Sequence, residues 1–265
     1  MNERTMPNSA PEQTRIANVH PPAWENPRAK DKYHMVVIGG GTAGLVTAAI
    51  ASGLGATTAL VERHWLGGDC LNVGCVPSKA LLRAARAWHA AGTARERFGG
   101  PAVQGQGEFG AVVRRMQKVR ASMSAADSAN RYRDMGVDVF FGEARFSSTR
   151  SISVNGQDLR FRRAVIATGT RPAIPSIPGL ADSGYFTNET IFSLDEVPRR
   201  LVVIGGGPIG CELAQAFARF GSNVTLLERG QRILGEDDPE ASGIVASALV
   251  RDGITLATGA EVQSV

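Results

Sequence analysis

The chain contains the same segment twice. Residues 35–63 align without a gap with residues 201–229, each residue matching the one 166 positions later, and twelve of the twenty-nine positions are identical. Each copy opens with an apolar run, MVVI or LVVI, which is typical of a strand buried on both faces. A glycine turn, an apolar-periodic stretch and a second apolar run ending in glutamate follow. This order predicts a βαβ unit in each copy, and therefore an α/β fold.

Both copies carry the pattern G-x-G-x-x-G between the first strand and the helix. In such a turn the first glycine permits the bend, the second lets a pyrophosphate approach the backbone, and the third lets the helix pack on the strand. The N–H groups of the helix N-terminus then face the phosphates. The pattern is weak alone, but its setting between strand and helix predicts two bound dinucleotides. The glycines are Gly39, Gly41 and Gly44 in the first copy and Gly205, Gly207 and Gly210 in the second.

An acidic residue closes each copy. Glu62 and Glu228 each follow the third glycine of their turn by eighteen residues. A carboxylate at this distance can accept hydrogen bonds from ribose hydroxyls. Glu228 would repel a 2′-phosphate, which favours NAD over NADP. Arg229 and Arg232 can partly offset that repulsion, so NADP stays possible.

Two cysteines five residues apart lie in the run GGDCLNVGCVPSK at residues 67–79. In a regular helix such residues are about 7.5 Å apart along the axis, which exceeds the about 7 Å limit on the Cα separation of a disulfide. A bridge between Cys70 and Cys75 therefore requires a distorted backbone, which Gly74 permits. A helix N-terminus or a nearby cation would lower the thiol pKa and favour the thiolate. The residues alone leave open a redox pair, two unrelated buried cysteines or a zinc site, although a second cysteine–histidine pair with ligand spacing is missing.

This run resembles the active-site signature of the pyridine nucleotide–disulfide oxidoreductases, the flavoproteins that include lipoamide dehydrogenase, glutathione reductase and mercuric reductase. The resemblance extends over nearly all of residues 34–265. It implies that the first fingerprint binds FAD and the second NAD(P)H, and that Cys70 and Cys75 form a redox-active disulfide. By the same resemblance, Cys70 exchanges thiols with the substrate, and Cys75 lies against the flavin and forms a charge-transfer complex as a thiolate.

Further site residues come from the same resemblance. Lys79 matches the lysine beside the reactive edge of the flavin, and Glu212 the glutamate that pairs with it. Gly68, within the cysteine signature, is assigned to FAD binding. Thr168 and Gly169 end the run AVIATG, which resembles the crossing from the FAD domain to the NAD domain. No metal ligand is expected. Cys211 is interpreted as a small buried residue.

The expected architecture is two Rossmann-like domains. Residues 33–170 form the FAD-binding domain with the redox disulfide, and residues 171–265 form a partial NAD(P)-binding domain. Residues 1–32, rich in proline, are expected to be a disordered tail, with Trp24 as a candidate anchor. Residues 108–135 are expected to form one long amphipathic helix.

Short strands are expected in three places after that helix and in one place near the C-terminal end. They are residues 137–141, 151–154, 159–161 and 254–256, with Asn155-Gly156 as the turn of a hairpin.

The ends of the chain bear on what it can do. Complete members of the family extend well beyond residue 265, where they finish the NAD domain and add an interface domain. That domain forms a homodimer and carries a histidine–glutamate pair that serves the partner subunit. The resemblance therefore implies a C-terminally truncated chain, which we expect to bind FAD weakly and turn over poorly alone.

Composition excludes several other classes. The 265 residues carry a net charge of +4, but the basic residues are scattered without interleaved aromatics, which argues against nucleic-acid binding. Three cysteines suit a reducing cytoplasm rather than a secreted scaffold. The first residues lack the apolar core that is typical of a signal peptide, and no apolar run reaches the about 18 residues of a membrane span, so a cytoplasmic location is expected.

The expected activity passes electrons between NAD(P)H, flavin and the Cys70–Cys75 disulfide, and the substrate is a small molecule, a metal ion or a disulfide. Residues 212–222 and the valine of CVPSK are most similar to mercuric reductase, whereas Glu228 is more similar to NAD-dependent dihydrolipoamide dehydrogenase. The first is favoured and the second is the alternative. A third hypothesis is a non-catalytic nucleotide-binding remnant left by truncation, against which the intact cysteine pair argues.

Overall fold

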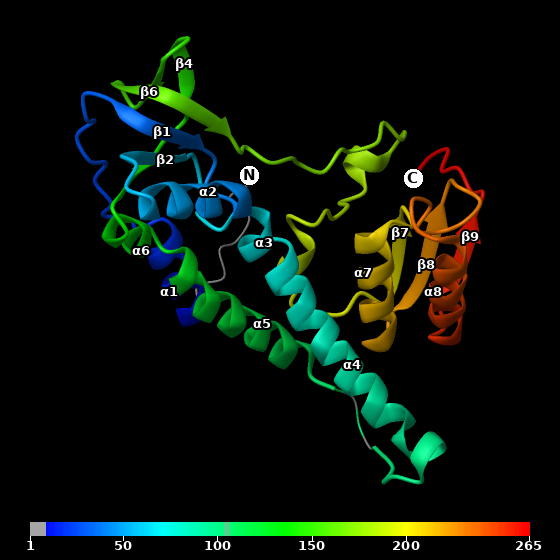
Figure 1. The fold of residues 1–265 in the computed structure, drawn as a ribbon. Coiled ribbons are helices and arrows are strands. Elements are labelled where there is room, and N and C mark those ends of the chain that lie inside the picture. The colour runs from blue at the N-terminus through cyan, green and yellow to red at the C-terminus, as the bar shows by residue number, and fades with distance from the viewer. Residues whose placement is uncertain (1–8, 104, 106) are drawn as a thin grey trace. The chain divides into compact units, whose positions relative to one another are not determined.

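The chain is described by a computed structural model that covers residues 9–103, 105 and 107–265 (Figure 1). Two compact units contain these residues. The first holds the described residues up to Pro77 together with Gln117–Pro172, and the second holds Ser78–Met116 with Ala173–Val265. Segment Ser78–Met116, which we expected within the FAD-binding domain, therefore clusters with the second unit.

The first unit is built on a six-stranded sheet with the order β3-β2-β1-β6-β5-β4. Strands β3, β2, β1 and β6 pair in parallel, and β6, β5 and β4 pair in antiparallel fashion. The α/β class with a largely parallel sheet is as predicted. The strands are β1 (Tyr33–Ile38), β2 (Thr58–Glu62), β3 (Val137–Phe141), β4 (Arg145–Ser148), β5 (Ser151–Val154) and β6 (Gln157–Ile166).

The first predicted βαβ unit is β1, α2 (Thr42–Gly53) and β2. Strand β1 ends where Gly39 adopts a φ of +107°, a left-handed value that favours glycine. Leu45 of α2 then packs beside Val37 and Leu60 in one buried cluster. The core of this unit thus lies between the sheet and its helices.

The predicted hairpin joins β5 and β6. Asn155 and Gly156 both have positive φ, 48° and 79°, which suits a two-residue turn between antiparallel strands. Strand β6 runs far beyond the expected residues 159–161, because its second half joins the parallel sheet beside β1. Strand β4 was not predicted.

The long helix expected at residues 108–135 is wrong. The segment forms α5 (Phe109–Ser124), a 3-10 turn at Ala125–Asp127 and α6 (Ala129–Asp134). Ser128 ends the helical run, because its backbone is extended, with φ −74° and ψ 145°. Its hydroxyl accepts a hydrogen bond from the Arg131 N–H at 3.3 Å. This is an N-cap, which starts a new helix.

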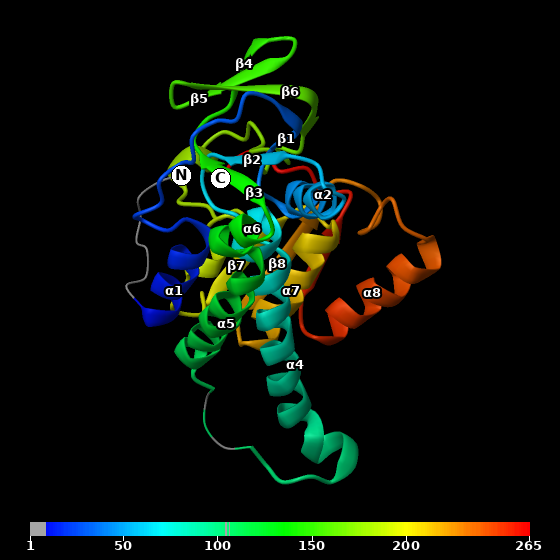
Figure 2. The same ribbon diagram turned by 60° about the vertical axis from the view of Figure 1, so that its left-hand side comes forward.

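The disordered tail expected at residues 1–32 is also wrong for the part that the structure describes, and residues 1–8 lie outside it. Residues Ala10–Val19 form helix α1, which lies beside α6 in both views (Figure 1, Figure 2). Trp24 anchors the following segment, since its Nε1 donates to the Val139 carbonyl at 3.2 Å and its ring meets Phe141 edge-on. Proline content predicted disorder, but buried side chains on α1 bind it to the body.

The cysteine signature lies on two consecutive helices. Helix α3 (Gly68–Asn72) is short, and α4 (Cys75–Phe98) is the longest helix described. Within the described ranges, no helix is both long and apolar enough to cross a membrane.

The second unit contains a three-stranded parallel sheet with the order β7-β8-β9. The predicted second βαβ unit is β7 (Arg200–Ile204), α7 (Pro208–Arg219) and β8 (Asn223–Glu228), and α8 (Pro239–Arg251) leads to β9 (Thr255–Thr258), which was predicted at residues 254–256. Short 3-10 turns lie at Leu180–Asp182 and Ile191–Ser193. Among the described residues β7 pairs with β8 alone, and Val202 is 60% exposed, so β7 is an apolar sheet edge.

Candidate functional site

The first glycine turn leaves no room for side chains at its first and third positions. A Cβ on Gly44 would lie 1.7 Å from the Gly39 carbonyl oxygen, so helix α2 touches the turn backbone to backbone. A Cβ on Gly39 would lie 2.2 Å from the Ala167 carbonyl oxygen of the neighbouring chain segment. The Gly44 contact is the close packing that the motif predicted for the third glycine, and the Gly39 contact is an additional constraint on the first.

The second glycine of this turn, Gly41, faces Gly68 of the cysteine signature. A Cβ on Gly68 would lie 2.6 Å from the Gly41 Cα, and Gly68 has a φ of +54°. Two glycines therefore meet at the N-terminus of α2, and the cysteine signature begins there. A surface of bare backbone at a helix N-terminus suits the close approach of a pyrophosphate.

The second turn repeats the first with the same backbone. Gly205 has a φ of +107°, equal to that of Gly39, and a Cβ on Gly210 would lie 2.0 Å from the Gly205 carbonyl oxygen. Gly207 has open space around its Cα. Sequence identity between the two copies thus extends to their conformation.

Glu62 and Glu228 make matching contacts that the sequence did not predict. Glu62 accepts hydrogen bonds from the N–H groups of Gly40 and His64, both at 2.7 Å. Glu228 accepts them from Gly206 at 2.7 Å and from Gly230 at 2.6 Å. Each carboxylate therefore ties the end of its strand to the glycine turn.

The same contacts explain the electrostatics of Glu228. The N–H groups of Gly230 and then Gly206 lower the pKa of Glu228 below its ordinary value, because hydrogen bonds to a carboxylate favour its charged form. The acid is ionised at neutral pH, as a carboxylate that receives ribose hydroxyls must be.

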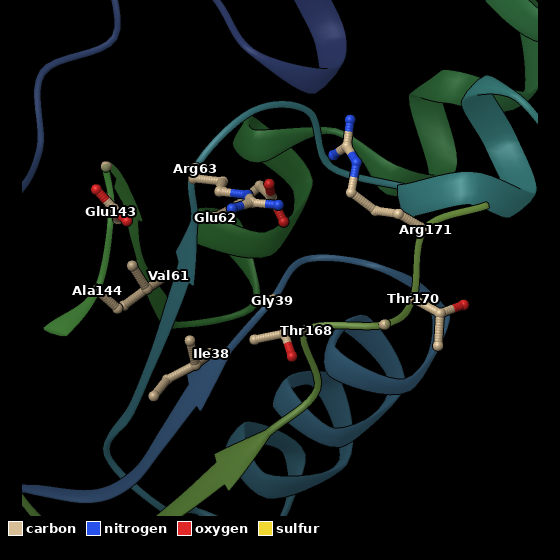
Figure 3. A pocket seen from close by; sticks show the side chains of 12 residues that line it. Ile38, Gly39, Val61, Glu62, Arg63, Glu143, Ala144, Thr168, Thr170 and Arg171 are labelled. Atoms are coloured by element: carbon tan, nitrogen blue, oxygen red, sulfur yellow. The ribbon is translucent and has the colours of Figure 1, made fainter. Parts of the chain in front are cut away.

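A cleft of about 360 Å³ opens at the carboxyl ends of the parallel strands of the first unit (Figure 3). Ligands of parallel α/β sheets bind at this edge, and the volume falls within the range of small-molecule sites. Glu62, Thr168 and Gly169, which we expected at the cofactor site, line it. So do residues that were not predicted: Arg63, Glu143 and Arg171.

The backbone between the two cysteines is broken, as a bridge would require. Helix α3 ends at Asn72, and α4 begins at Cys75. Position 74 requires glycine for lack of space, not for an unusual φ. A Cβ there would lie 2.8 Å from the Asp69 carbonyl oxygen, too close for any side chain.

The two side chains meet across this break. Cys70 and Cys75 are thiols in the structure and are joined by a side-chain hydrogen bond, and the Thr42 hydroxyl at the start of α2 also contacts the Cys70 thiol. Burial, followed by the neighbouring Cys75, raises the pKa of Cys70, and the Thr42 hydroxyl opposes this rise. A helix N-terminus or cation was expected to lower that pKa, and the structure gives the opposite direction.

Lys79 and Glu212 lie together in the second unit. The Lys79 Nζ is 2.6 Å from both carboxylate oxygens of Glu212. Cys211, one residue earlier, is 5% exposed and contacts the Gly206 carbonyl oxygen at 3.4 Å, which agrees with a small buried residue. Burial raises the pKa of Cys211, so this thiol stays protonated.

Comparison with known proteins decides the family. The model of the pyridine nucleotide-disulphide oxidoreductases matches residues 33–265. The chain belongs to this family. Members of this family generally bind FAD and NAD(P)H.

Several relatives carry names. A mercuric reductase of Lysinibacillus sphaericus is 37% identical over 236 residues, which cover 89% of this chain and 43% of that protein. A dihydrolipoyl dehydrogenase of Acholeplasma laidlawii is 35% identical over 242 residues, covering 88% of this chain and 70% of the relative. The chain spans 43%, 37% and 42% of the lengths of three mercuric reductases that it matches.

A solved structure agrees with this assignment. The HOCl-induced flavoprotein disulfide reductase RclA from Escherichia coli, in its Cu(II) complex, superposes with a TM-score of 0.76 at 29% identity. The match covers 89% of this chain and 51% of the RclA chain. The matched region therefore includes residues of both units.

Proposed function

We propose that the protein from which this chain comes is an FAD-dependent NAD(P)H:disulfide oxidoreductase of the mercuric reductase type. The observation that carries the proposal is the break between α3 and α4. It puts the Cys70 and Cys75 thiols in contact, next to Thr42 of the helix that begins at the first glycine turn. A cysteine pair with a purely structural role would not need to lie beside a nucleotide-binding turn.

The residues of the first unit fit FAD. The facing glycines Gly41 and Gly68 leave bare backbone at the N-terminus of α2, where the pyrophosphate would lie. The cleft with Glu62 and Thr168 offers carboxylate and hydroxyl groups to the ribose and adenine. When bound, FAD supplies the hydride chemistry that amino acid side chains lack.

NAD(P)H would bind at the second turn, with Gly207 under the pyrophosphate and Glu228 at the ribose. The structure favours NAD over NADP beyond what the sequence did. The Arg232 guanidinium donates to the carbonyls of Leu234, Asp237 and Gly235 at 3.1, 2.9 and 2.6 Å. Because Arg232 is engaged in its own loop, it is not held ready for a 2′-phosphate.

The two cysteines carry the second half of the reaction. NADH and a proton convert the disulfide to two thiols and leave NAD⁺, so the electron pair breaks one S–S bond. Cys70 would then exchange with the substrate through its sulfur, and Cys75 would be the thiol that faces the flavin. The family resemblance assigns the Lys79–Glu212 ion pair of the second unit to the flavin as well. The dihydrolipoamide reaction would run in the opposite direction, from dithiol to NAD⁺.

Mercuric ion is the favoured substrate, because thiolates bind soft metal ions well and because named relatives at 37–39% identity are mercuric reductases. Dihydrolipoamide is the alternative, supported by relatives named dihydrolipoyl dehydrogenase at 35% and 37% identity. A homodimer belongs to the proposal for the complete protein.

The test counts electrons. The purified chain is oxidised to the Cys70–Cys75 disulfide, saturated with FAD and titrated anaerobically with dithionite, and separate oxidised samples are titrated with NADH and with NADPH. The proposal predicts two electrons for the disulfide in addition to the two for the flavin, and only the flavin's two in a Cys75→Ser variant. Equal electron uptake by both proteins would contradict the redox role and favour a nucleotide-binding remnant.

A further inference from the structure

Helix α1 brings charged side chains into the interior of the first unit. Glu12 is 2% exposed and Arg15 4% exposed, and Arg120 of α5, at 8%, joins them. Ionised side chains are almost never buried to this degree unless they are paired. A tail that only covered the surface would have no need of them.

The three charges form one network. Glu12 Oε2 accepts from Arg15 Nε at 3.0 Å, and Glu12 Oε1 accepts from Arg120 Nη2 at 2.5 Å and Nε at 3.1 Å. One carboxylate therefore holds two guanidiniums that would otherwise repel each other. Removing it would leave two buried like charges without a counter-ion.

Both guanidinium groups donate a hydrogen bond to the same residue, Asn72. Arg15 Nη1 donates to the Asn72 side-chain oxygen at 2.6 Å, and Arg120 Nη1 donates to its backbone carbonyl at 2.8 Å. The Asn72 amide nitrogen in turn donates to the carbonyls of Leu66 and Gly68 at 3.0 and 2.8 Å. Asn72 thereby ties the charge network to both ends of α3.

Asn72 lies between the two cysteines of the signature. It is the last residue of α3, two residues after Cys70 and three before Cys75. The break between α3 and α4 begins immediately after it, and this break lets the two thiols meet. Its side chain is 5% exposed, so water does not compete for these contacts.

We infer that α1 is a positioning element for the cysteine pair: Glu12 holds Arg15 and Arg120 on Asn72, and this fixes the bend that brings Cys70 and Cys75 together. The inference rests on the proposed redox role of the pair. It makes Glu12 a positioning residue, distant in sequence from the thiols and without contact to them. A fixed bend raises the effective concentration of one thiol at the other and so favours the disulfide.

The test measures the thiol–disulfide equilibrium of the full chain with glutathione. Oxidised glutathione takes the electron pair of the two thiols, giving the Cys70–Cys75 disulfide and two reduced glutathiones. The bridged peptide is quantified by mass spectrometry after the remaining thiols are alkylated. For Glu12→Gln we expect the equilibrium constant for disulfide formation to fall at least threefold, which is about 14 mV toward a more positive potential at about 30 mV per tenfold.

Two further variants separate positioning from general stability. Asn18→Ala removes a contact of the same helix with α5, the 2.9 Å hydrogen bond from Asn18 to Ser124, which does not reach Asn72, and should leave the constant unchanged. The triple variant Glu12→Leu, Arg15→Met, Arg120→Leu replaces the charges by apolar groups, which often preserves stability. It should fold, and its constant should fall as in Glu12→Gln.

The outcomes are distinct. A folded triple variant with the wild-type constant, or a shift toward the disulfide, would overturn the positioning role and leave the redox role intact. If the wild-type chain forms no Cys70–Cys75 disulfide at any glutathione ratio, the proposed function fails, and this inference fails with it. An equal fall in Asn18→Ala would also overturn the inference, since it would show a response to any weakening of α1.

Discussion

The Lys79 ammonium lies 2.6 Å from both carboxylate oxygens of Glu212, although 133 residues separate them in the sequence. The two side chains are 61% and 37% exposed. An ion pair with this exposure contributes at most about 1 kcal/mol to stability. Its contribution to folding is therefore small, and its proposed role at the flavin is open to direct test.

We predict that Glu212→Gln changes the free energy of unfolding by less than about 1 kcal/mol but slows NADH reduction of the FAD-saturated chain by about tenfold or more, as expected when a positioned charge is lost from a reacting centre. Urea unfolding and stopped-flow absorbance measure the two effects. Glu108→Gln, which breaks the exposed Arg114–Glu108 ion pair, is the matched control and should affect neither. A large loss of stability with an unchanged reduction rate would show that the contact is structural.

We predict that the third glycine of each turn is required for binding a different nucleotide. Gly44→Ala places a Cβ 1.7 Å from a backbone oxygen and should abolish FAD binding, and Gly210→Ala, at 2.0 Å, should weaken NADH binding but not FAD binding. Isothermal titration with each nucleotide measures both.

Glycines without neighbours serve as controls for these substitutions. Gly53→Ala in α2 and Gly243→Ala in α8 meet no atom within 4 Å. Each should leave binding unchanged and stabilise its helix by up to about 1 kcal/mol. Equal effects of Gly44→Ala and Gly210→Ala on both nucleotides would contradict the assignment of one dinucleotide to each turn.

Glu228 should make stability depend on pH. Its pKa is lowered in the folded state by the N–H groups of Gly230 and Gly206, from an ordinary value of 4.5. Its contribution is therefore fully present above pH 4.5 and is lost as the pH falls through the lower, folded pKa. Glu228→Gln should destabilise the chain to urea at pH 7 and have a smaller effect at pH 3. A difference that does not change with pH would contradict the hydrogen-bonded carboxylate.

Cys70 should react as a thiol of raised pKa in the chain without cofactor. Burial and the neighbouring Cys75 raise its pKa above 9.0, and the Thr42 hydroxyl lowers it. The rate of Cys70 alkylation by iodoacetamide should therefore still be increasing with pH at pH 9.0. Cys75→Ser should shift the profile to lower pH, and Thr42→Val should shift it to higher pH. Shifts of the same sign in both variants would contradict the contacts around this thiol.

Much of the site followed from the sequence because its determinants are local. The backbone of a glycine turn depends mainly on its own residues, so the motif located both tight turns, at Gly39–Gly44 and Gly205–Gly210, and the gapless repeat predicted the shared βαβ unit. Asn155-Gly156 likewise fixes a hairpin through its own backbone preferences.

Contacts between residues far apart in the sequence could not be predicted from local sequence patterns. The charges of α1 looked like those of a solvated tail, because only the partners Arg120 and Asn72, 108 and 60 residues away from Glu12, make their burial favourable. Ser128 stopped a helix that its neighbours would have continued. The pKa of Cys70 depends on burial, which the spacing of cysteines does not reveal.

The proposed mechanism requires a thiolate of the cysteine pair to contact the flavin, and an anaerobic absorbance titration tests for this contact. The chain is saturated with FAD and reduced anaerobically with NADH or dithionite, beside a Cys75→Ser variant. We expect a long-wavelength charge-transfer band in the wild-type chain that is missing from the variant. FAD bound tightly by both proteins, with no such band in either, would contradict the claim.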